Sequence, residues 1–126
     1  MIAGIGIDMI EVERVAEKIG KNMGFRELVF SAGEISYCEA KTNKYEHYAA
    51  RFAAKEAFLK AAGTGWMNEL NLFEIEIVND EAGKPAIKLS GNTAQAIESK
   101  HFTHISVSLS HLKSVASAIV IIETDQ

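Results

Sequence analysis

GIGIDMI, residues 4–10, decides how this chain folds, because it places a carboxylate inside an apolar, strand-like run. Side chains alternate along a strand, so the two glycines share one face with Asp8, and the isoleucines at 5 and 7 share the other with Met9. The apolar residues predict a buried strand. A buried carboxylate is costly unless it is paired or binds a metal, so Asp8 needs a partner elsewhere in the chain.

The glycine face of this stretch has two interpretations. The bare backbone leaves room for a ligand or metal, or another element packs tightly on it while Asp8 caps the helix that begins near Glu11. This stretch alone favours the second interpretation. A dinucleotide-binding loop is a poor interpretation, because the third glycine is missing and the glycines lie within the strand.

RFAAKEAFLKAAGTG, residues 51–65, holds a second acid on an apolar stripe. Glu56 follows Ala49, Phe52 and Ala53 at helical spacing, and Lys60 lies one turn further along. Glu56 and Lys60 form a simple i, i+4 pair, or Glu56 faces Asp8 across a cation while Lys60 meets a phosphate. Mg²⁺ suits the second arrangement, because it takes one or two protein carboxylates together with water and substrate phosphate oxygens.

The rest of the chain predicts an α+β fold with a small, mainly antiparallel sheet packed against helices. Strands are expected at 2–10, 73–78, 86–90, 104–110 and 115–122, the last of them central because it is apolar on both faces. Helices are expected at 11–22, after the capping box SAGE (31–34), at 44–62 with Gly63 as the stop, and at 92–100. The apolar face of the first helix is predicted to be Val12, Val15, Ala16, Ile19 and Met23.

Composition narrows the class of protein. The 126 residues fit one domain, 1–126, and the net charge of −4 gives no support to nucleic-acid binding. The apolar runs are too short to span a membrane, and Asp8 interrupts any signal-peptide pattern. Cys38 is the single cysteine, so no internal disulfide is expected. A cytoplasmic protein without a membrane partner is therefore the expectation.

HISVSLSH, residues 104–111, raises the question of a nucleophilic serine. Ser110 and His111 are neighbours in a predicted strand and point to opposite faces, so they cannot act as nucleophile and base. The four histidines also lack the spacing of a zinc site. Neither a serine hydrolase nor a zinc enzyme is indicated.

GIGIDMIEVERV, RFAAKEAFLKAAGTG and VSLSH (107–111) together resemble the holo-acyl-carrier-protein synthases, the short bacterial-type 4'-phosphopantetheinyl transferases. NDEAGKPAIKLSG (79–91) is similar to the hairpin of that family. The resemblance implies a 4'-phosphopantetheinyl transferase-like fold. It also implies transfer of 4'-phosphopantetheine from coenzyme A (CoA) to a serine of apo-acyl carrier protein, with release of adenosine 3',5'-bisphosphate, in support of fatty acid biosynthesis.

The resemblance also assigns roles to residues. Asp8 and Glu56 are expected to bind Mg²⁺, with the glycine face giving the ligand room, and Lys60 is expected near the transferring phosphate. Glu56 is the candidate base for the carrier serine, and a hydroxide on the cation is the alternative. The residues expected along CoA, besides Lys60, are Gly63, Gly65, Lys84, Pro85 and His111. The family forms homotrimers with sites between subunits, so His111 is expected to serve a neighbouring copy's Asp8.

Carrier binding is expected on the first helix and just after it. The basic and aromatic residues of this strip are Arg14, Lys18, Lys21, Phe25 and Arg26. A solvated helix face is the simpler interpretation of the same charges. Two other functions remain open at this stage: a metal-dependent phosphohydrolase that uses the same acid pair, and a non-catalytic CoA-binding module.

Overall fold

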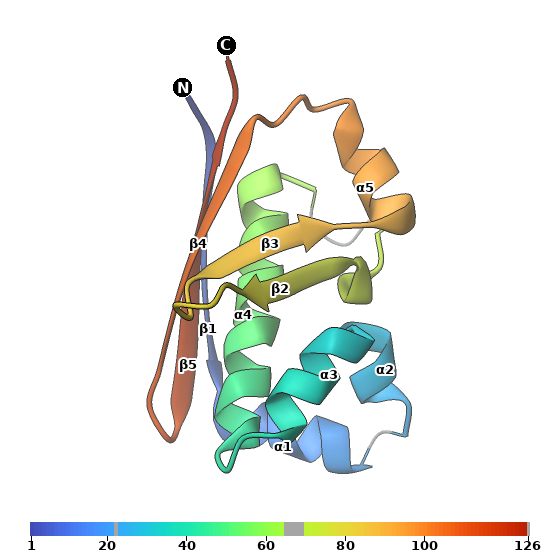
Figure 1. Cartoon of the computed structure of the whole chain (residues 1–126), viewed down its shortest axis with the longest axis vertical. Helices are drawn as coiled ribbons and strands as arrows, with labels where there is room; N and C mark the ends of the chain where they lie inside the picture. The colour runs from blue at the N-terminus through green and yellow to red at the C-terminus, as the bar shows by residue number, and fades with distance from the viewer. Residues whose placement is uncertain (22, 65–69, 126) are drawn as a thin grey trace.

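The computed structural model describes residues 1–21, 23–64 and 70–125, and Figure 1 shows their arrangement. The strands are β1 (Ile2–Glu11), β2 (Ile75–Asn79), β3 (Pro85–Leu89), β4 (His104–His111) and β5 (Val115–Glu123). The helices are α1 (Val12–Lys21), α2 (Phe25–Val29), α3 (Ala32–Glu39), α4 (Lys44–Ala62) and α5 (Gly91–Glu98), with a 3-10 turn, η1 (Leu72–Glu74). Among these residues, no helix is both long and apolar enough to cross a membrane.

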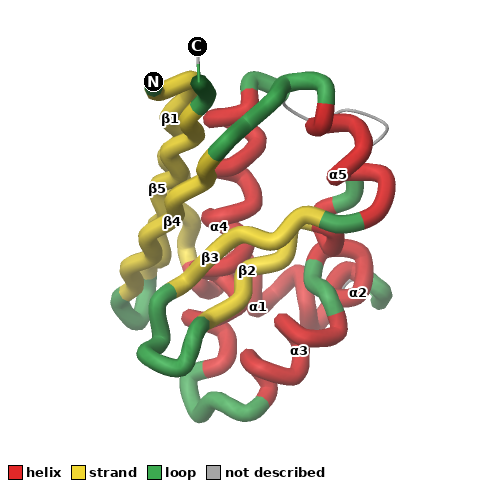
Figure 2. The backbone as a smooth tube through the Cα atoms, turned by 45° about the horizontal axis from the view of Figure 1, so that its top comes forward, coloured by secondary structure: helices red, strands yellow, loops and turns green. Residues whose placement is uncertain are grey.

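The predicted α+β fold with antiparallel strands is confirmed. β1, β5 and β4 form one antiparallel sheet with β5 in the centre, and β2 and β3 form a separate hairpin. α4 runs along the three-stranded sheet, while α1, α2 and α3 surround its first half (Figures 1 and 2). The sequence did not predict α2, and the strand expected from residue 73 begins at Ile75 because η1 precedes it.

The glycine face of β1 points inward, onto α4. A Cβ atom on Gly4 would lie 1.8 Å from the carbonyl oxygen of Ala61, and one on Gly6 would lie 1.9 Å from that of Ala57. Only glycine lets the strand backbone come this close to the helix backbone. The expectation that this face leaves room for a ligand is therefore wrong, and the tight-packing interpretation is confirmed. Asp8 lies within β1 and pairs with Lys60 rather than capping α1.

The apolar face of β1 points outward, which contradicts the predicted buried strand. Ile5, Ile7 and Met9 are 58%, 61% and 67% exposed, and Ile119 on the neighbouring strand β5 is 37% exposed. α4 packs on the face that the glycines occupy, so the isoleucines are left on the other face. Met23, predicted on the apolar face of α1, is fully exposed because it lies beyond the end of that helix.

A buried ion pair fixes the opposite side of α4. Lys55 and Glu34 have fully buried side chains and lie 2.7 Å apart. Lys55 also donates to the carbonyl oxygens of Leu72 and Ile75, and Glu34 accepts from the backbone N–H of Ile77 at 2.8 Å. Both charges are compensated by several bonds, which is the condition under which a buried pair is tolerated. The network ties α3 and the start of the hairpin to α4.

The close contact between β1 and α4 predicts unequal effects for two glycine substitutions. Gly6→Ala places a methyl group against the Ala57 carbonyl and should lower the free energy of unfolding by about 2 kcal/mol or more. Gly20→Ala, in α1 with no atom within 4 Å of the new Cβ, should raise it by up to about 1 kcal/mol. Urea unfolding of both variants measures the difference, and equal stability of Gly6→Ala and the parent would contradict the packing.

Candidate active site

Asp8, Glu56 and Lys60 meet where β1 lies against α4. The Lys60 ammonium is 3.2 Å from Oδ1 of Asp8 and donates to the carbonyl oxygen of Ile7 at 3.0 Å. Among the described contacts, Lys60 makes no hydrogen bond to Glu56, so the simple i, i+4 pair is not formed. Lys60 instead reaches from the last turn of α4 to the strand.

Glu56 lies in an unusual environment for a carboxylate. Its Oε2 atom is buried and has no hydrogen-bond partner among the described residues. Burial raises the pKa of Glu56, the negative charge of Asp8 raises it further, and Lys60 and Lys18 oppose the shift. An unpartnered carboxylate oxygen beside a second carboxylate is a position that a cation would stabilise.

The acid pair suits some metals and not others. Within the described part of the chain, His, Cys, Asp and Glu side chains form no group of three or more that could hold a metal. Structural zinc sites need four protein ligands, whereas Mg²⁺ accepts one or two carboxylates and fills its other positions with water and phosphate oxygens. Asp8 and Glu56 therefore fit Mg²⁺ better than zinc.

The predicted basic strip borders this cluster. The Lys18 ammonium lies 5.8 Å from the ring centre of Phe25 and 5.9 Å from that of Phe52. Its positive charge acts to lower the pKa of Glu56. Lys18 therefore connects α1 to the acid pair through an aromatic surface.

The remaining residues of the strip differ in their partners. Arg14 is exposed on α1, and Lys21 pairs with Glu17 at 3.3 Å. Arg26, in α2, contacts two acidic side chains, Glu27 at 2.8 Å and Glu39 at 3.2 Å. All these ion pairs are solvent-accessible, so they are weak and a partner can displace them.

A second cluster lies at a cavity of about 210 Å³ whose lining includes the predicted residues His111 and Pro85. Arg51 also lines it and was not predicted from the sequence. The Arg51 guanidinium lies 4.1 Å from the ring centre of Tyr37 and donates to Asn79, while its buried Nε has no partner among the described residues. A buried guanidinium with a free donor is suited to an anion.

Within the described residues, the two clusters do not form one pocket. The cavity at His111 is lined by none of Asp8, Glu56 and Lys60. Gly63 ends α4 in the left-handed conformation, as predicted, and is exposed. Lys84 is exposed in the turn before β3, and Gly65 lies outside the described residues.

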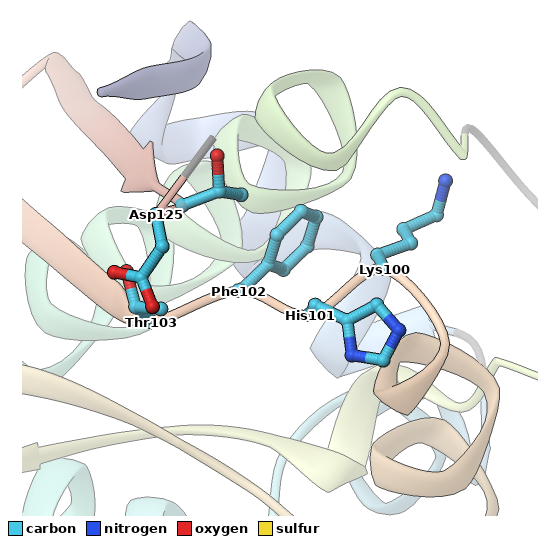
Figure 3. Close-up of a pocket in the computed structure, with 6 residues that line it drawn as sticks. Lys100, His101, Phe102, Thr103 and Asp125 are labelled. Atoms are coloured by element: carbon cyan, nitrogen blue, oxygen red, sulfur yellow. The ribbon is translucent and has the colours of Figure 1, made fainter.

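A larger hollow of about 750 Å³ lies between residues 100–103 and the end of β5 (Figure 3). Lys100 and His101 point away from Asp125, on the other side of Phe102. Its charged groups do not converge on one point, and it contains none of the predicted site residues. The candidate site is therefore at Asp8, Glu56 and Lys60.

Comparisons with known proteins identify the family of this chain. Residues 4–120 match the model of the 4'-phosphopantetheinyl transferase superfamily. A holo-[acyl-carrier-protein] synthase from Cytophaga hutchinsonii is 50% identical, and the alignment covers 96% of this chain and 97% of that protein.

Solved structures give the same assignment. The holo-[acyl-carrier-protein] synthase from Neisseria meningitidis has a TM-score of 0.89 at 29% identity, covering 98% of this chain and 100% of that one. The synthase–CoA complex from Chronobacterium ammoniagenes has a TM-score of 0.87 at 28% identity, covering 98% of each chain. The matched length, the fold and the whole-chain relatives together show that this chain belongs to the 4'-phosphopantetheinyl transferase superfamily.

Proposed function

We propose that this protein transfers 4'-phosphopantetheine from CoA to a serine of apo-acyl carrier protein and so supports fatty acid biosynthesis. The products are holo-acyl carrier protein and adenosine 3',5'-bisphosphate. The observation that carries the proposal is the meeting of Asp8, Glu56 and Lys60 in a chain whose full-length relatives are holo-[acyl-carrier-protein] synthases. Two carboxylates and an ammonium are the groups that a phosphoryl transfer needs for positioning and charge compensation.

The acid pair is proposed to hold Mg²⁺. The Oε2 of Glu56, which lacks a partner within residues 1–21, 23–64 and 70–125, and its raised pKa support this assignment, because a divalent cation would replace the missing partner and offset the repulsion from Asp8. When bound there, Mg²⁺ would polarise the pyrophosphate of CoA and stabilise charge on the leaving phosphate. The transferase activity would then require the metal.

Lys60 and Glu56 are proposed to act directly on the reacting groups. Lys60 is more than half exposed, so its ammonium can turn from Asp8 to a phosphate of CoA. Glu56 is proposed to accept the proton of the carrier serine as the serine oxygen bonds to phosphorus and the bond to adenosine bisphosphate breaks.

The cavity at His111 is proposed to hold the phosphate-bearing adenosine end of CoA. Arg51 offers a buried donor with no partner among the residues that the structure describes, and Pro85 and His111 line the same cavity. Gly63, Gly65 and Lys84 remain predicted CoA contacts. The cavity and the acid pair are separate within one chain, so one CoA molecule is proposed to bridge two copies.

A homotrimer with shared sites is proposed on this basis. The outward apolar face of β1 and β5 carries Ile5, Ile7, Met9 and Ile119, and exposed apolar patches of this kind mark protein contacts. A second copy on this face would bury it and bring its own His111 toward the acid pair of the first. A cytoplasmic location and a single domain over residues 1–126 remain predictions.

The carrier protein is proposed to dock on the basic strip of α1 and α2. Arg14, Lys18 and Lys21 are exposed, and Phe25 adds apolar surface beside them. An acidic carrier would gain attraction from this strip although the whole chain carries a net charge of −4. The phosphohydrolase and the non-catalytic module are not favoured, because whole-chain relatives are named as synthases of holo-acyl carrier protein.

Removing the acid pair should abolish transfer. Asp8→Ala and Glu56→Gln should each lower the rate by about a hundredfold or more, because charge compensation and proton acceptance are lost. Intact mass spectrometry of an apo-acyl carrier protein, incubated with CoA and Mg²⁺, measures the added phosphopantetheine. Chelation should stop the reaction, and Glu98→Gln on α5 is the unaffected control. Hydrolysis of CoA without labelling of any carrier would instead favour the phosphohydrolase.

Co-expression of two inactive variants should test the shared site. Asp8→Ala and His111→Ala subunits should each be weak alone and partly active together, because random assembly joins the two intact halves at about a quarter of the interfaces. The rate of carrier labelling by the co-purified mixture is the measurement. If the mixture labels the carrier no faster than the average of the two variants alone, the whole site lies within one chain.

Charge reversal at Arg14 should weaken carrier binding alone. Arg14→Glu should raise the KM for the carrier at least about tenfold at low salt, because it repels an acidic partner, and should leave CoA affinity unchanged. Steady-state kinetics and calorimetry with CoA separate the two effects. Lys100→Glu makes the same charge change far from the strip and is the matched control. Equal losses for both substrates would contradict the docking surface.

A further inference from the structure

Glu46 joins the first turn of α4 to the end of β4. Its Oε1 atom lies 2.8 Å from Nδ1 of His111, a residue 65 positions away in the sequence. The two side chains are only 18% and 28% exposed, so water competes weakly for the bond. Among the hydrogen bonds of the described residues, this one connects His111 to α4.

The contact decides which nitrogen of the His111 ring carries hydrogen. A carboxylate only accepts, so the Nδ1 atom next to Glu46 must donate. Nε2 is then left as an acceptor for a donor group of the ligand, such as the adenine amino group of CoA, in the cavity that His111 shares with Arg51 and Pro85. The His47 ring packs edge-on against His111 at 5.1 Å between ring centres, which limits rotation of the imidazole.

We propose that Glu46 is a positioning residue for CoA binding, which acts by holding the His111 ring with Nε2 available to the cavity. The inference rests on the proposed function, since it takes CoA as the ligand of this cavity. Glu46 itself does not line the cavity, so its effect passes through His111. Its expected role is in substrate affinity rather than in the chemical step.

Helix stability is the competing explanation for Glu46. An acidic residue in the first turn stabilises a helix through the helix dipole, and Glu46 holds that position in α4. Glu13 holds the same position in α1, is exposed, and has no carboxylate–histidine contact among the described bonds. Glu13→Ala therefore removes the equivalent dipole effect from α1 without touching a histidine. It serves as the matched control for losing an acidic residue from the first turn of a helix.

A double-mutant cycle on the full chain tests the proposal. Calorimetric titration with CoA should show about tenfold weaker binding for Glu46→Ala, as expected for losing a charge-assisted hydrogen bond. In a His111→Ala background the same substitution should add no further loss, because its target is gone. Glu46→Gln, whose amide oxygen can still accept from Nδ1, should recover most of the affinity. Glu13→Ala should bind CoA like the parent.

The tautomer of His111 gives a second readout that a purely structural role would not change. Nitrogen NMR, with His111 assigned by its loss in His111→Ala, should show hydrogen on Nδ1 in the parent and a shift toward Nε2 in Glu46→Ala. Unchanged CoA affinity in Glu46→Ala, an equal loss in the His111→Ala background, or an unchanged tautomer overturns the inference. A parent protein that binds no CoA overturns the proposed function itself, and the inference with it.

Discussion

The contact between the backbone of β1 and the backbone of α4 is the constraint on which the candidate site depends. Gly4 and Gly6 place the strand where any side chain would collide with the carbonyl oxygens of Ala61 and Ala57. This closeness lets Lys60 reach the strand and brings Asp8 near enough to Glu56 for its charge to raise that residue's pKa. The glycines thus serve the chemistry indirectly, by setting the distance between the two elements.

Lys55 and Glu56 are adjacent charged residues of α4, but one is part of the core and the other is part of the candidate site. Successive residues of a helix point about 100° apart, so Lys55 faces the core while Glu56 faces β1. Lys55 has its charge matched by Glu34 and its other donors used by backbone oxygens. Glu56 keeps an oxygen that has no hydrogen-bond partner in the described part of the chain. The first arrangement fixes the rotation of the helix against the hairpin, and the second leaves a charge for a ligand to satisfy.

The sequence predicted the elements well where a local signal defines them. The bounds of α4, its end at Gly63 and the capping box of Ser31 and Glu34 depend on spacing and capping within one segment, and all three are confirmed. The short helix α2 was missed, because five residues contain too little periodicity to separate a helix from a loop.

Tertiary features were harder to predict for a physical reason. Alternation shows which residues of β1 share a face but not which face meets the helix, so Ile5 and Ile7 were expected inside and lie outside. Spacing along α4 suggested a Glu56–Lys60 pair, but a long lysine side chain can choose a partner on another element. Arg51 carries no local signal for burial, because its partners Tyr37 and Asn79 come from other segments.

The charges of the two clusters argue for a site completed by a second copy. Asp8 and Glu56 bring negative charge that needs a cation, and Arg51 brings a buried donor that needs an anion. CoA carries phosphates at both its pyrophosphate and its adenosine end, so with a cation it would satisfy both clusters at once. One chain keeps the clusters apart, yet it exposes an apolar strand face beside the acid pair. In the proposed trimer, one contact between subunits would bury the apolar strand face and also bring the two clusters together.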